Sequence, residues 1–237
     1  NYVINWGDAS PNYTSTTWGT GVANAITHNY AVGIHQLTLY VYAGSCVDTA
    51  LYNVFIGSNP GGSISSPSST QGCTGTTFSF PFANVAGNSP GTDYYIYVND
   101  GSDTLHYTQE TLPSTFIHTF DSTSCGIAPN NTFTISYSIV NPCGETPGTI
   151  GGIRISKKAE ADFSIAPNDT TCVGNTITLT NTSTVGSTVP NAGNGACTNG
   201  KTIWEITPAA GWTINTGSLG SNNSLPNNPD AWTSGTD

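Results

Sequence analysis

The sequence predicts an all-β protein built from repeated domains, on three observations. The apolar residues occur in short runs of Val, Ile, Tyr, Phe and Thr bounded by Gly, Pro, Asn and Asp, a pattern typical of many short strands joined by turns. No stretch shows the periodicity of a helix, and the strong helix formers are sparse. A block of roughly 95 residues recurs along the chain, which indicates repeated domains.

The repeat rests on four ungapped matches that keep their order and approximate spacing. They place His28 on His118 and Cys46 on Cys143. One chance match between two β-rich stretches is common, but four in the same order indicate a true internal repeat. The matches are 1–10 on 93–102, 26–30 on 116–120, 37–41 on 133–137 and 45–49 on 142–146.

A third, partial copy comes after the second. Residues 172–183 align with the alternating stretch that starts at Cys73, and residues 201–206 align with 93–98. No third copy of residues 26–56 appears, so we expect the chain to start inside one domain and stop inside another. The expected divisions are the C-terminal part of a domain at 1–57, a complete domain at 62–158 and the N-terminal part of a third at 159–237.

The elements of the first segment follow from alternation and turn residues. Leu37, Leu39 and Val41 alternate with Thr and Tyr, which predicts a strand with two distinct faces. The middle segment should repeat these elements after an early strand at 73–82. In the first segment we expect a strand and Gly-Asp turn at 1–10, a polar loop at 11–25, a strand at 37–41, a turn at 44–46, a strand at 49–56 and a linker at 58–69.

Charge excludes two classes of partner. The net charge is −10 and only four side chains are Lys or Arg, so there is no basic patch for phosphates and we expect no nucleic-acid partner. An anionic bilayer would repel such a chain, and no apolar run has membrane-spanning length, so we expect no membrane insertion. The chain lacks an initiating Met and a signal peptide, and we expect it to be a mature or excised piece of a longer protein.

Six cysteines favour disulfides and an oxidising, extracytoplasmic location. None forms a C-x-x-C pair, so zinc or thioredoxin chemistry is poorly supported. The six are Cys46, Cys73, Cys125, Cys143, Cys172 and Cys197.

The pairing of these cysteines does not follow from their spacing alone. We favour bonds within single domains that bracket strand segments, which join Cys125 to Cys143. By the same reasoning Cys172 pairs with Cys197. The first two cysteines of the chain then either pair across the linker or bond to cysteines outside this sequence.

Two stretches carry a family resemblance, NWGDAS at 5–10 and HNYAVGIHQLTLYV at 28–41. The first is similar to the W-x-F-G-D-G-S turn, and the second to the H-x-Y-x-x-P-G-x-Y-x-V-x-L stretch, of the PKD domain, an immunoglobulin-like β-sandwich. Ala9, Val32 and His35 depart from that pattern. The resemblance implies tandem immunoglobulin-like, PKD-like sandwiches, with the first and last incomplete.

The order C-x-G-x-T, W-x-I and TSCG…NPCG is similar to the tandem repeats of very long Bacteroidota surface adhesins, which are secreted by the type IX system and some of which are linked to gliding motility. This resemblance implies a repetitive stalk or filament segment at the extracellular cell surface, a mechanical spacer that supports adhesion or gliding. Its partners would be neighbouring domains of the same long chain, surface polysaccharide or other cell-surface proteins. No G-x-S-x-G, H-E-x-x-H or other catalytic motif occurs, and we expect neither an enzyme nor a cofactor.

Two alternatives remain open. A self-assembling filament subunit could complete its partial domains by strand donation. A glycan-binding module of a secreted degradative enzyme would need exposed aromatics, with core packing as the other use of these side chains. The candidates are Tyr40, Tyr42, Tyr94, Tyr97, Tyr107, Trp18, Trp212 and Trp232.

The sequence contains candidates for a calcium site and for O-glycosylation sites. Asp100 and Asp103 could bind calcium, while the other interpretation is that Asp100, like Asp8, caps the backbone of a tight turn. His28 and His118 occupy matching positions, which favours a packing role in each domain. The Bacteroidota resemblance implies O-glycosylation where Asp precedes Ser or Thr, at Thr49, Thr104, Ser122 and Thr170.

Overall fold

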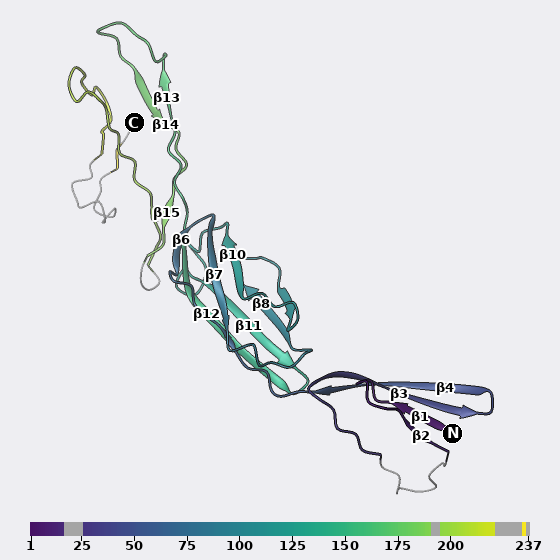
Figure 1. Cartoon of the computed structure of the whole chain (residues 1–237). Helices are drawn as coiled ribbons and strands as arrows, with labels where there is room; N and C mark the ends of the chain where they lie inside the picture. Colours follow the sequence, from purple (N-terminus) through teal and green to yellow (C-terminus); the bar gives the residue numbers. More distant parts are fainter. Residues whose placement is uncertain (17–25, 191–194, 221–233, 236–237) are drawn as a thin grey trace. The chain divides into compact units, whose positions relative to one another are not determined.

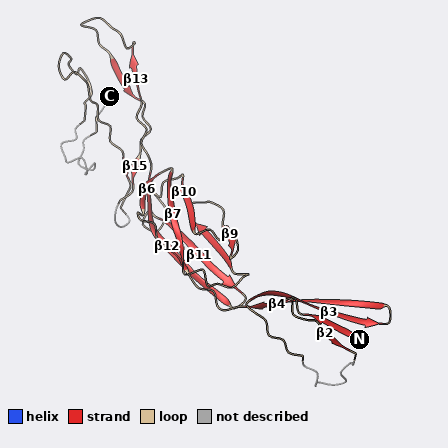
Figure 2. Cartoon of the chain, in the orientation of Figure 1, coloured by secondary structure: helices blue, strands red, loops and turns tan. Residues whose placement is uncertain are grey.

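The computed structural model describes residues 1–16, 26–190, 195–220 and 234–235, and within them the chain is all β (Figure 2). No helix occurs in these ranges, and hence none long and apolar enough to cross a bilayer. The strands are labelled in Figure 1 where there is room. They are β1 Tyr2–Asn5, β2 Tyr13–Ser15, β3 Gly33–Ala43, β4 Cys46–Ile56, β5 Ser63–Ile64, β6 Gln71–Cys73, β7 Thr76–Ala83, β8 Asp93–Val98, β9 Leu105–Thr108, β10 Thr115–Phe120, β11 Phe133–Asn141, β12 Gly144–Ser156, β13 Phe163–Ala166, β14 Thr178–Asn181, β15 Ser187–Thr188 and β16 Thr198–Asn199.

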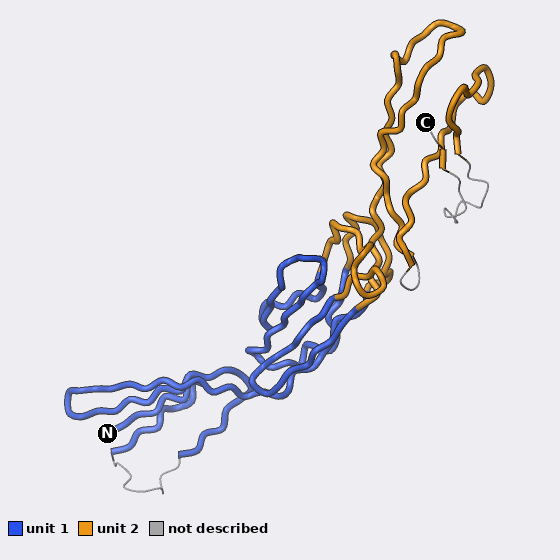
Figure 3. Tube along the Cα trace, turned by 180° about the vertical axis from the view of Figure 1, so that it is seen from behind, with its two compact units in different colours: residues 1–66, 79–116, 135–150 blue, residues 67–78, 117–134, 151–237 orange. Residues whose placement is uncertain are grey.

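The described chain falls into two compact units (Figure 3). Strands β7, β10, β11 and β12 contribute residues to both. The expected domain boundaries therefore stay a prediction. Unit 1 comprises residues 1–66, 79–116 and 135–150, and unit 2 comprises residues 67–78, 117–134 and 151–237.

The first sheet has the order β2-β1-β3-β4 and is antiparallel throughout. The hairpin β3–β4 pairs eleven residues of each strand around a two-residue turn, so the strands expected at 37–41 and 49–56 are confirmed and are longer than expected. The expected loop at 11–25 contains the short strand β2, because the chain turns back after β1 and pairs Tyr13 with Ile4. Residues 17–25 lie outside the described ranges.

Two sheets form the middle of the chain, β10-β7-β5 and β6-β12-β11-β8-β9. In unit 1, Phe82 of the β10-β7-β5 sheet contacts Tyr94 of the five-stranded sheet, with ring centroids 6.0 Å apart. In unit 2, Phe120 stacks on Phe133 at 5.0 Å. Aromatic and branched side chains therefore fill the space between two sheets, as in a β-sandwich. The core side chains exposed by 2% or less are Phe80, Tyr94, Ile96, Val98, Phe116, Phe120, Phe133, Ile135, Ile139, Ile153 and Ile155.

The strand orders confirm the internal repeat. The first sheet, β2-β1-β3-β4, reappears as β9-β8-β11-β12 in the five-stranded sheet. The register differs by two residues: Tyr2 pairs with Val41, whereas its match Tyr94 pairs with Ile139 instead of Tyr137. A shift of two residues leaves every side chain on its original face, so the apolar pattern tolerates it.

Two expected correspondences are only partly realised, for one physical reason. Residues 26–30, which match β10, form no strand, and neither do residues 201–206, which match β8. A strand needs a hydrogen-bonded neighbour. Among the described residues of each segment, the strand that would pair with them has no counterpart: β7 for the first segment and β11 for the third.

Candidate functional site

The two Gly-Asp or Asp-Gly corners have the capping geometry that the sequence predicts. The Asp8 Oδ1 atom accepts a hydrogen bond from the Ser10 backbone N–H at 3.0 Å, and Asp100 Oδ1 accepts one from Ser102 N–H at 3.0 Å. The Ser102 hydroxyl also donates to Asp100 at 2.7 Å. Asp103 is exposed beside this turn, and no group of three metal-ligating side chains occurs in the described ranges, so calcium stays an untested alternative.

An aromatic stack closes the Asp8 corner. Trp6 and His28 stack with centroids 4.3 Å apart, the edge of Tyr30 meets His28 at 4.7 Å, and His35 stacks on Tyr30 at 4.7 Å. His28 Nε2 lies 2.7 Å from Asp8 Oδ2. The hydrogen bond from His28 is the main cause that lowers the pKa of Asp8 from 3.8 to about 2. The packing role predicted for His28 is confirmed.

The Tyr30 hydroxyl lies under this corner and is buried without a hydrogen-bond partner. The neighbouring imidazoles bond elsewhere, His28 to Asp8 and His35 to the Ala31 carbonyl at 2.9 Å. Burial and then the Asp8 charge raise the pKa of Tyr30, because both disfavour a phenolate here.

The cysteine pairing that we favoured from the sequence is wrong. Cys125 is bonded to Cys197, with Cα atoms 6.1 Å apart. The other four cysteines, Cys46, Cys73, Cys143 and Cys172, are free and exposed, so the bond across the linker is also absent. The disulfide joins the expected second and third domains instead of closing a loop within one.

The positions of the cysteines relative to the strands explain why the predicted pairing is wrong. Cys125 precedes β11 and Cys143 comes after it, and a strand of nine residues spans about 30 Å, far beyond the ~6 Å of a disulfide. Cys172 lies in the β13–β14 loop, whereas Cys197 adjoins β16. Because β16 pairs with β15, near the bridge from Lys157 to Ser187, the length of a hairpin separates these two cysteines.

The four O-glycosylation candidates are all exposed to solvent. Thr49, Thr104, Ser122 and Thr170 all lie at the surface. The Thr170 hydroxyl donates to Asp169 Oδ1 at 3.2 Å, so at this position the acidic residue directly contacts the candidate acceptor. Modification of these four side chains stays a prediction.

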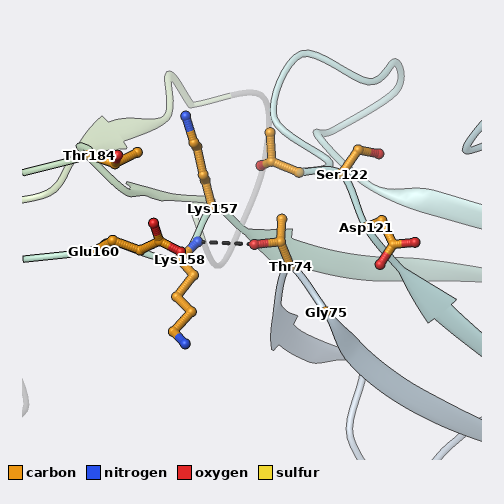
Figure 4. Close-up of a pocket in the computed structure, with 9 residues that line it drawn as sticks. Thr74, Gly75, Asp121, Ser122, Lys157, Lys158, Glu160 and Thr184 are labelled. Carbon is orange, nitrogen blue, oxygen red and sulfur yellow. Dashed lines mark hydrogen bonds between the residues drawn. The ribbon is translucent and has the colours of Figure 1, made fainter.

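Ser122 also lines an open depression of about 580 Å³ in unit 2 (Figure 4). Lys157 and Lys158 lie on its other side and point in opposite directions, so their ammonium groups do not converge on one ligand. The Lys158 N–H donates to the Thr74 hydroxyl at 3.3 Å, which ties the chain after β12 to the loop before β7. The residues that line the depression therefore come both from the middle sandwich and from the segment after β12.

Two of the exposed aromatics lie on β8, whereas others lie on the first sheet, where Tyr52 of β4 is 69% exposed. Tyr94 is 1% exposed and belongs to the core, but Tyr95 and Tyr97 are 41% and 49% exposed on the opposite face. His106 stacks on Tyr95 with centroids 4.7 Å apart and lies 2.8 Å from Asp93 Oδ1. Tyr95 was not among the predicted aromatics, although strict alternation in β8 places it on the same face as Tyr97.

The other aromatic candidates do not extend this face. Tyr42 is 39% exposed on β3, and the indole N–H of Trp212 donates to the Pro208 carbonyl at 2.7 Å. Trp18 and Trp232 lie outside the described ranges.

Among the residues that the structure describes, one face of the first sheet is less covered than the matching face of the middle sandwich. Tyr2, Ile4, Leu37 and Leu39 are only partly buried. Their matches Tyr94, Ile96, Phe133 and Ile135 are 0–1% exposed, because the β10-β7-β5 layer covers them. Of the residues that the structure describes, His28 and Tyr30 of the 26–30 segment lie in the place of that layer, through the contacts given above.

Comparison with solved structures finds a remote likeness. The chain is similar to the solution structure of the PKD domain from human VPS10 domain-containing receptor SorCS2, with 14% sequence identity, 62% of this chain and 95% of that chain covered, and a TM-score of 0.33. No protein-family model and no curated protein matches the sequence. The fold described above rests on the chain's own strand order.

Proposed function

We propose that the chain is a load-bearing segment of a repetitive extracellular stalk, made of PKD-like modules of a Bacteroidota surface adhesin secreted by the type IX system. Each module holds distance and resists pulling, while adhesion or gliding depends on the array or its tip. Its partners are neighbouring modules of the same long chain, with surface polysaccharide or other surface proteins reached by the array. The chain has no catalytic role in this proposal. The disulfide is compatible with an extracytoplasmic location.

The observation that carries this proposal is the parallel pairing of β6 with β12. These strands lie near the start and the end of the middle sandwich, and Arg154, Ile155 and Ser156 pair with Gln71, Gly72 and Cys73. Flanking bonds extend the ladder, from Arg154 N–H to Thr70 O at 2.8 Å and from Thr74 N–H to Ser156 O at 2.9 Å. A pull on the two ends of the sandwich would slide parallel strands along each other, so all these bonds would have to fail together.

Single-molecule pulling on the whole chain under reducing conditions tests this role. We expect one resolved event that releases the 62–158 segment, about 340 Å of contour at ~3.5 Å per residue. Thr74→Pro removes the N–H that bonds Ser156 and should lower the force of that event. The matched control is Ser68→Pro, at an exposed position outside the strands, which should leave the force unchanged. Equal forces for both variants, or gradual extension without a resolved event, would refute the load-bearing role.

A glycan-binding role is the second candidate, favoured by Tyr95, Tyr97 and His106. Their rings share one exposed sheet face, and flat aromatic rings present apolar area with little loss of side-chain entropy. A glycan array with the whole chain tests this role, with Tyr95→Ala/Tyr97→Ala as the loss-of-binding variant and Tyr42→Ala as the control. An array without a hit would refute it.

A further inference from the structure

The segment that follows the first sheet is held by hydrogen bonds, although the composition of residues 58–69 predicts a linker. The Gly61 N–H donates to Asn88 Oδ1 at 2.8 Å, and the Gly61 carbonyl accepts a bond from Asn88 Nδ2 at 2.8 Å. The carbonyl of Pro60, a buried residue, accepts a bond from the Thr146 hydroxyl at 2.7 Å. Two successive residues of this segment are therefore bound to the middle sandwich.

Ser58, in the same segment, belongs to a closed ring of hydrogen bonds. Its N–H donates to the Ser89 hydroxyl at 3.3 Å, and its carbonyl accepts a bond from Asn141 Nδ2 at 3.0 Å. Asn141 Nδ2 also donates to the Thr92 hydroxyl at 3.2 Å, and this hydroxyl donates to the Ser89 carbonyl at 2.7 Å. Ser89, Thr92 and Asn141 are 3%, 0% and 8% exposed. Buried polar groups cost free energy when they lose their partners, so the ring holds Ser58 in place.

Asn88 connects this segment to the core of the middle sandwich. Its Nδ2 atom also donates to the hydroxyl of Tyr94, a side chain that is 1% exposed, at 2.7 Å. That hydroxyl donates to Gln109 Oε1, and Gln109 Nε2 donates to the Val85 carbonyl at 3.2 Å. A continuous set of hydrogen bonds therefore runs from Gly61 to a core tyrosine, so movement of the segment would break bonds inside the sandwich.

The junction after β12 repeats the first of these contacts. The match that begins with Cys172 on Cys73, continued without a gap, places Ser187 on Asn88. Ser187 exchanges two backbone hydrogen bonds with Lys157, at 2.9 and 3.1 Å, and Asn88 likewise exchanges two with the segment before it. The two junctions therefore share a two-bond contact at one position of the repeat, made by a backbone in one case and by a side-chain amide in the other.

A second position of the repeat also serves both junctions. The match of residues 201–206 to 93–98, extended towards the N-terminus, places Cys197 on Ser89. The hydroxyl of Ser89 binds the segment before the middle sandwich, whereas Cys197 is covalently bonded to Cys125 of that sandwich. A hydroxyl at one junction and a disulfide at the other therefore close the same place.

We propose that residues 57–61 form a rigid coupling between the first sheet and the middle sandwich, and that both junctions are closed at the same two positions of the repeat. The first sheet contributes as well, since a Cβ on Gly91 would lie 2.5 Å from Ile34 Cδ1 of β3, and the φ of Gly91 is +79°. Only glycine allows a side chain to come so close to the backbone at such a φ. A pull on one segment then reaches the next without slack between them.

An engineered disulfide tests the coupling in the full chain. A Cβ on Gly57 would lie 2.6 Å from the Ser89 hydroxyl oxygen, so the two β-carbons lie within about 4 Å, the separation that a disulfide needs. With the four exposed free cysteines replaced by Ser, Gly57→Cys with Ser89→Cys should lose both thiols on mild oxidation and give a linked peptide in mass spectrometry.

The matched control is Gly61→Cys with Ser89→Cys, because no atom lies within 4 Å of a Cβ on Gly61. This pair should stay reduced under the same conditions. Equal oxidation of the two pairs would show that the segment moves freely between both positions, and would overturn the coupling. The cysteine pairs report on residues 57–61, whereas the pulling test reports on the β6–β12 ladder, so failure of the coupling is distinguishable from failure of the load-bearing role.

Backbone dynamics give a second readout that does not depend on how the cysteine variants fold. In the unaltered chain, NMR order parameters at Ser58 and Gly61 should be about 0.85, as in rigid backbone, whereas flexible segments fall below about 0.6. Thr146→Val removes the donor to the Pro60 carbonyl and should lower the hydrogen-exchange protection of the Gly61 N–H about five-fold. Thr149→Val, at an exposed position of the same strand, should leave it unchanged. Order parameters below about 0.6 at Ser58 and Gly61 would overturn the proposal, and so would equal protection in the two variants.

Discussion

Breaking the Cys125–Cys197 bond should destabilise the segments that it joins, and the loop length gives the size of the effect. The two cysteines are 72 residues apart. In the chain-entropy account, a crosslink of that separation lowers the entropy of the unfolded chain by an amount worth about 4 kcal/mol at 25 °C. Cys125→Ser with Cys197→Ser should therefore lower the free energy of unfolding by up to about 4 kcal/mol. The control, Cys143→Ser, alters an exposed free thiol and should change it little.

The disulfide also limits the length to which the chain can be extended, and this limit does not depend on the entropy account. Under oxidising conditions the 72 residues between the sulfurs cannot lengthen, so reduction should add about 250 Å of contour at ~3.5 Å per residue. Urea denaturation measures the stability difference and single-molecule pulling measures the length. Equal contour lengths before and after reduction would refute the pairing. A stability difference near zero with the expected gain in length would refute the entropy estimate alone.

Three further predictions concern single side chains. The pKa of Asp8 is lowered by its histidine partner to about 2, so the stability it contributes is present above pH ~4 and lost as the pH falls toward 2. The protection factors of the β1 and β3 amides against hydrogen exchange should fall over that range, and Asp8→Asn should flatten the change. Gly7→Ala should destabilise the first sheet by about 1–3 kcal/mol in urea denaturation, because its Cβ would lie 2.3 Å from a β3 carbonyl oxygen at a φ of +76°. The control Gly44→Ala has a φ of +64° but no atom within 4 Å of the added Cβ, so it should cost only the backbone strain. Equal losses of stability in the two variants would contradict the clash. Tyr30→Phe removes a buried hydroxyl without a partner and should be neutral or stabilising by thermal denaturation, whereas Tyr94→Phe loses hydrogen bonds and should destabilise by about 1 kcal/mol; the reverse order would contradict the assignment.

Local features of this fold were predictable because each depends on neighbouring residues. The Asp8 and Asp100 corners follow from side chains that accept bonds from a backbone two residues away. The β3–β4 hairpin follows from alternation on both sides of a short turn. In these cases the sequence contains both partners of the interaction within a few positions.

Features that depend on distant partners were not predictable in the same way. Residues 26–30 and 201–206 have the side chains of strands, but pairing decides whether they form one, and no local signal shows that a partner strand is missing. The predicted cysteine pairing was wrong for a related reason. We confined each bond to one domain and did not consider the length of β11, which separates Cys125 from Cys143. The register shift of β8 on β11 leaves every face unchanged, so alternation contains no trace of it.

The disulfide lies where it can hold the junction after β12 together under a pulling force. The ladder of the middle sandwich ends at Ser156, and the next residue, Lys157, exchanges two backbone hydrogen bonds with Ser187 at 2.9 and 3.1 Å. Cys125–Cys197 lies on the same connection, since β16, which comes directly after Cys197, pairs with β15 at Ser187. A pull that leaves β12 therefore meets a second set of backbone bonds and a covalent bond before it can extend residues 158–196. In this chain the link between successive segments is built from the same strand pairing as the segments themselves, and the disulfide keeps it closed when the hydrogen bonds yield.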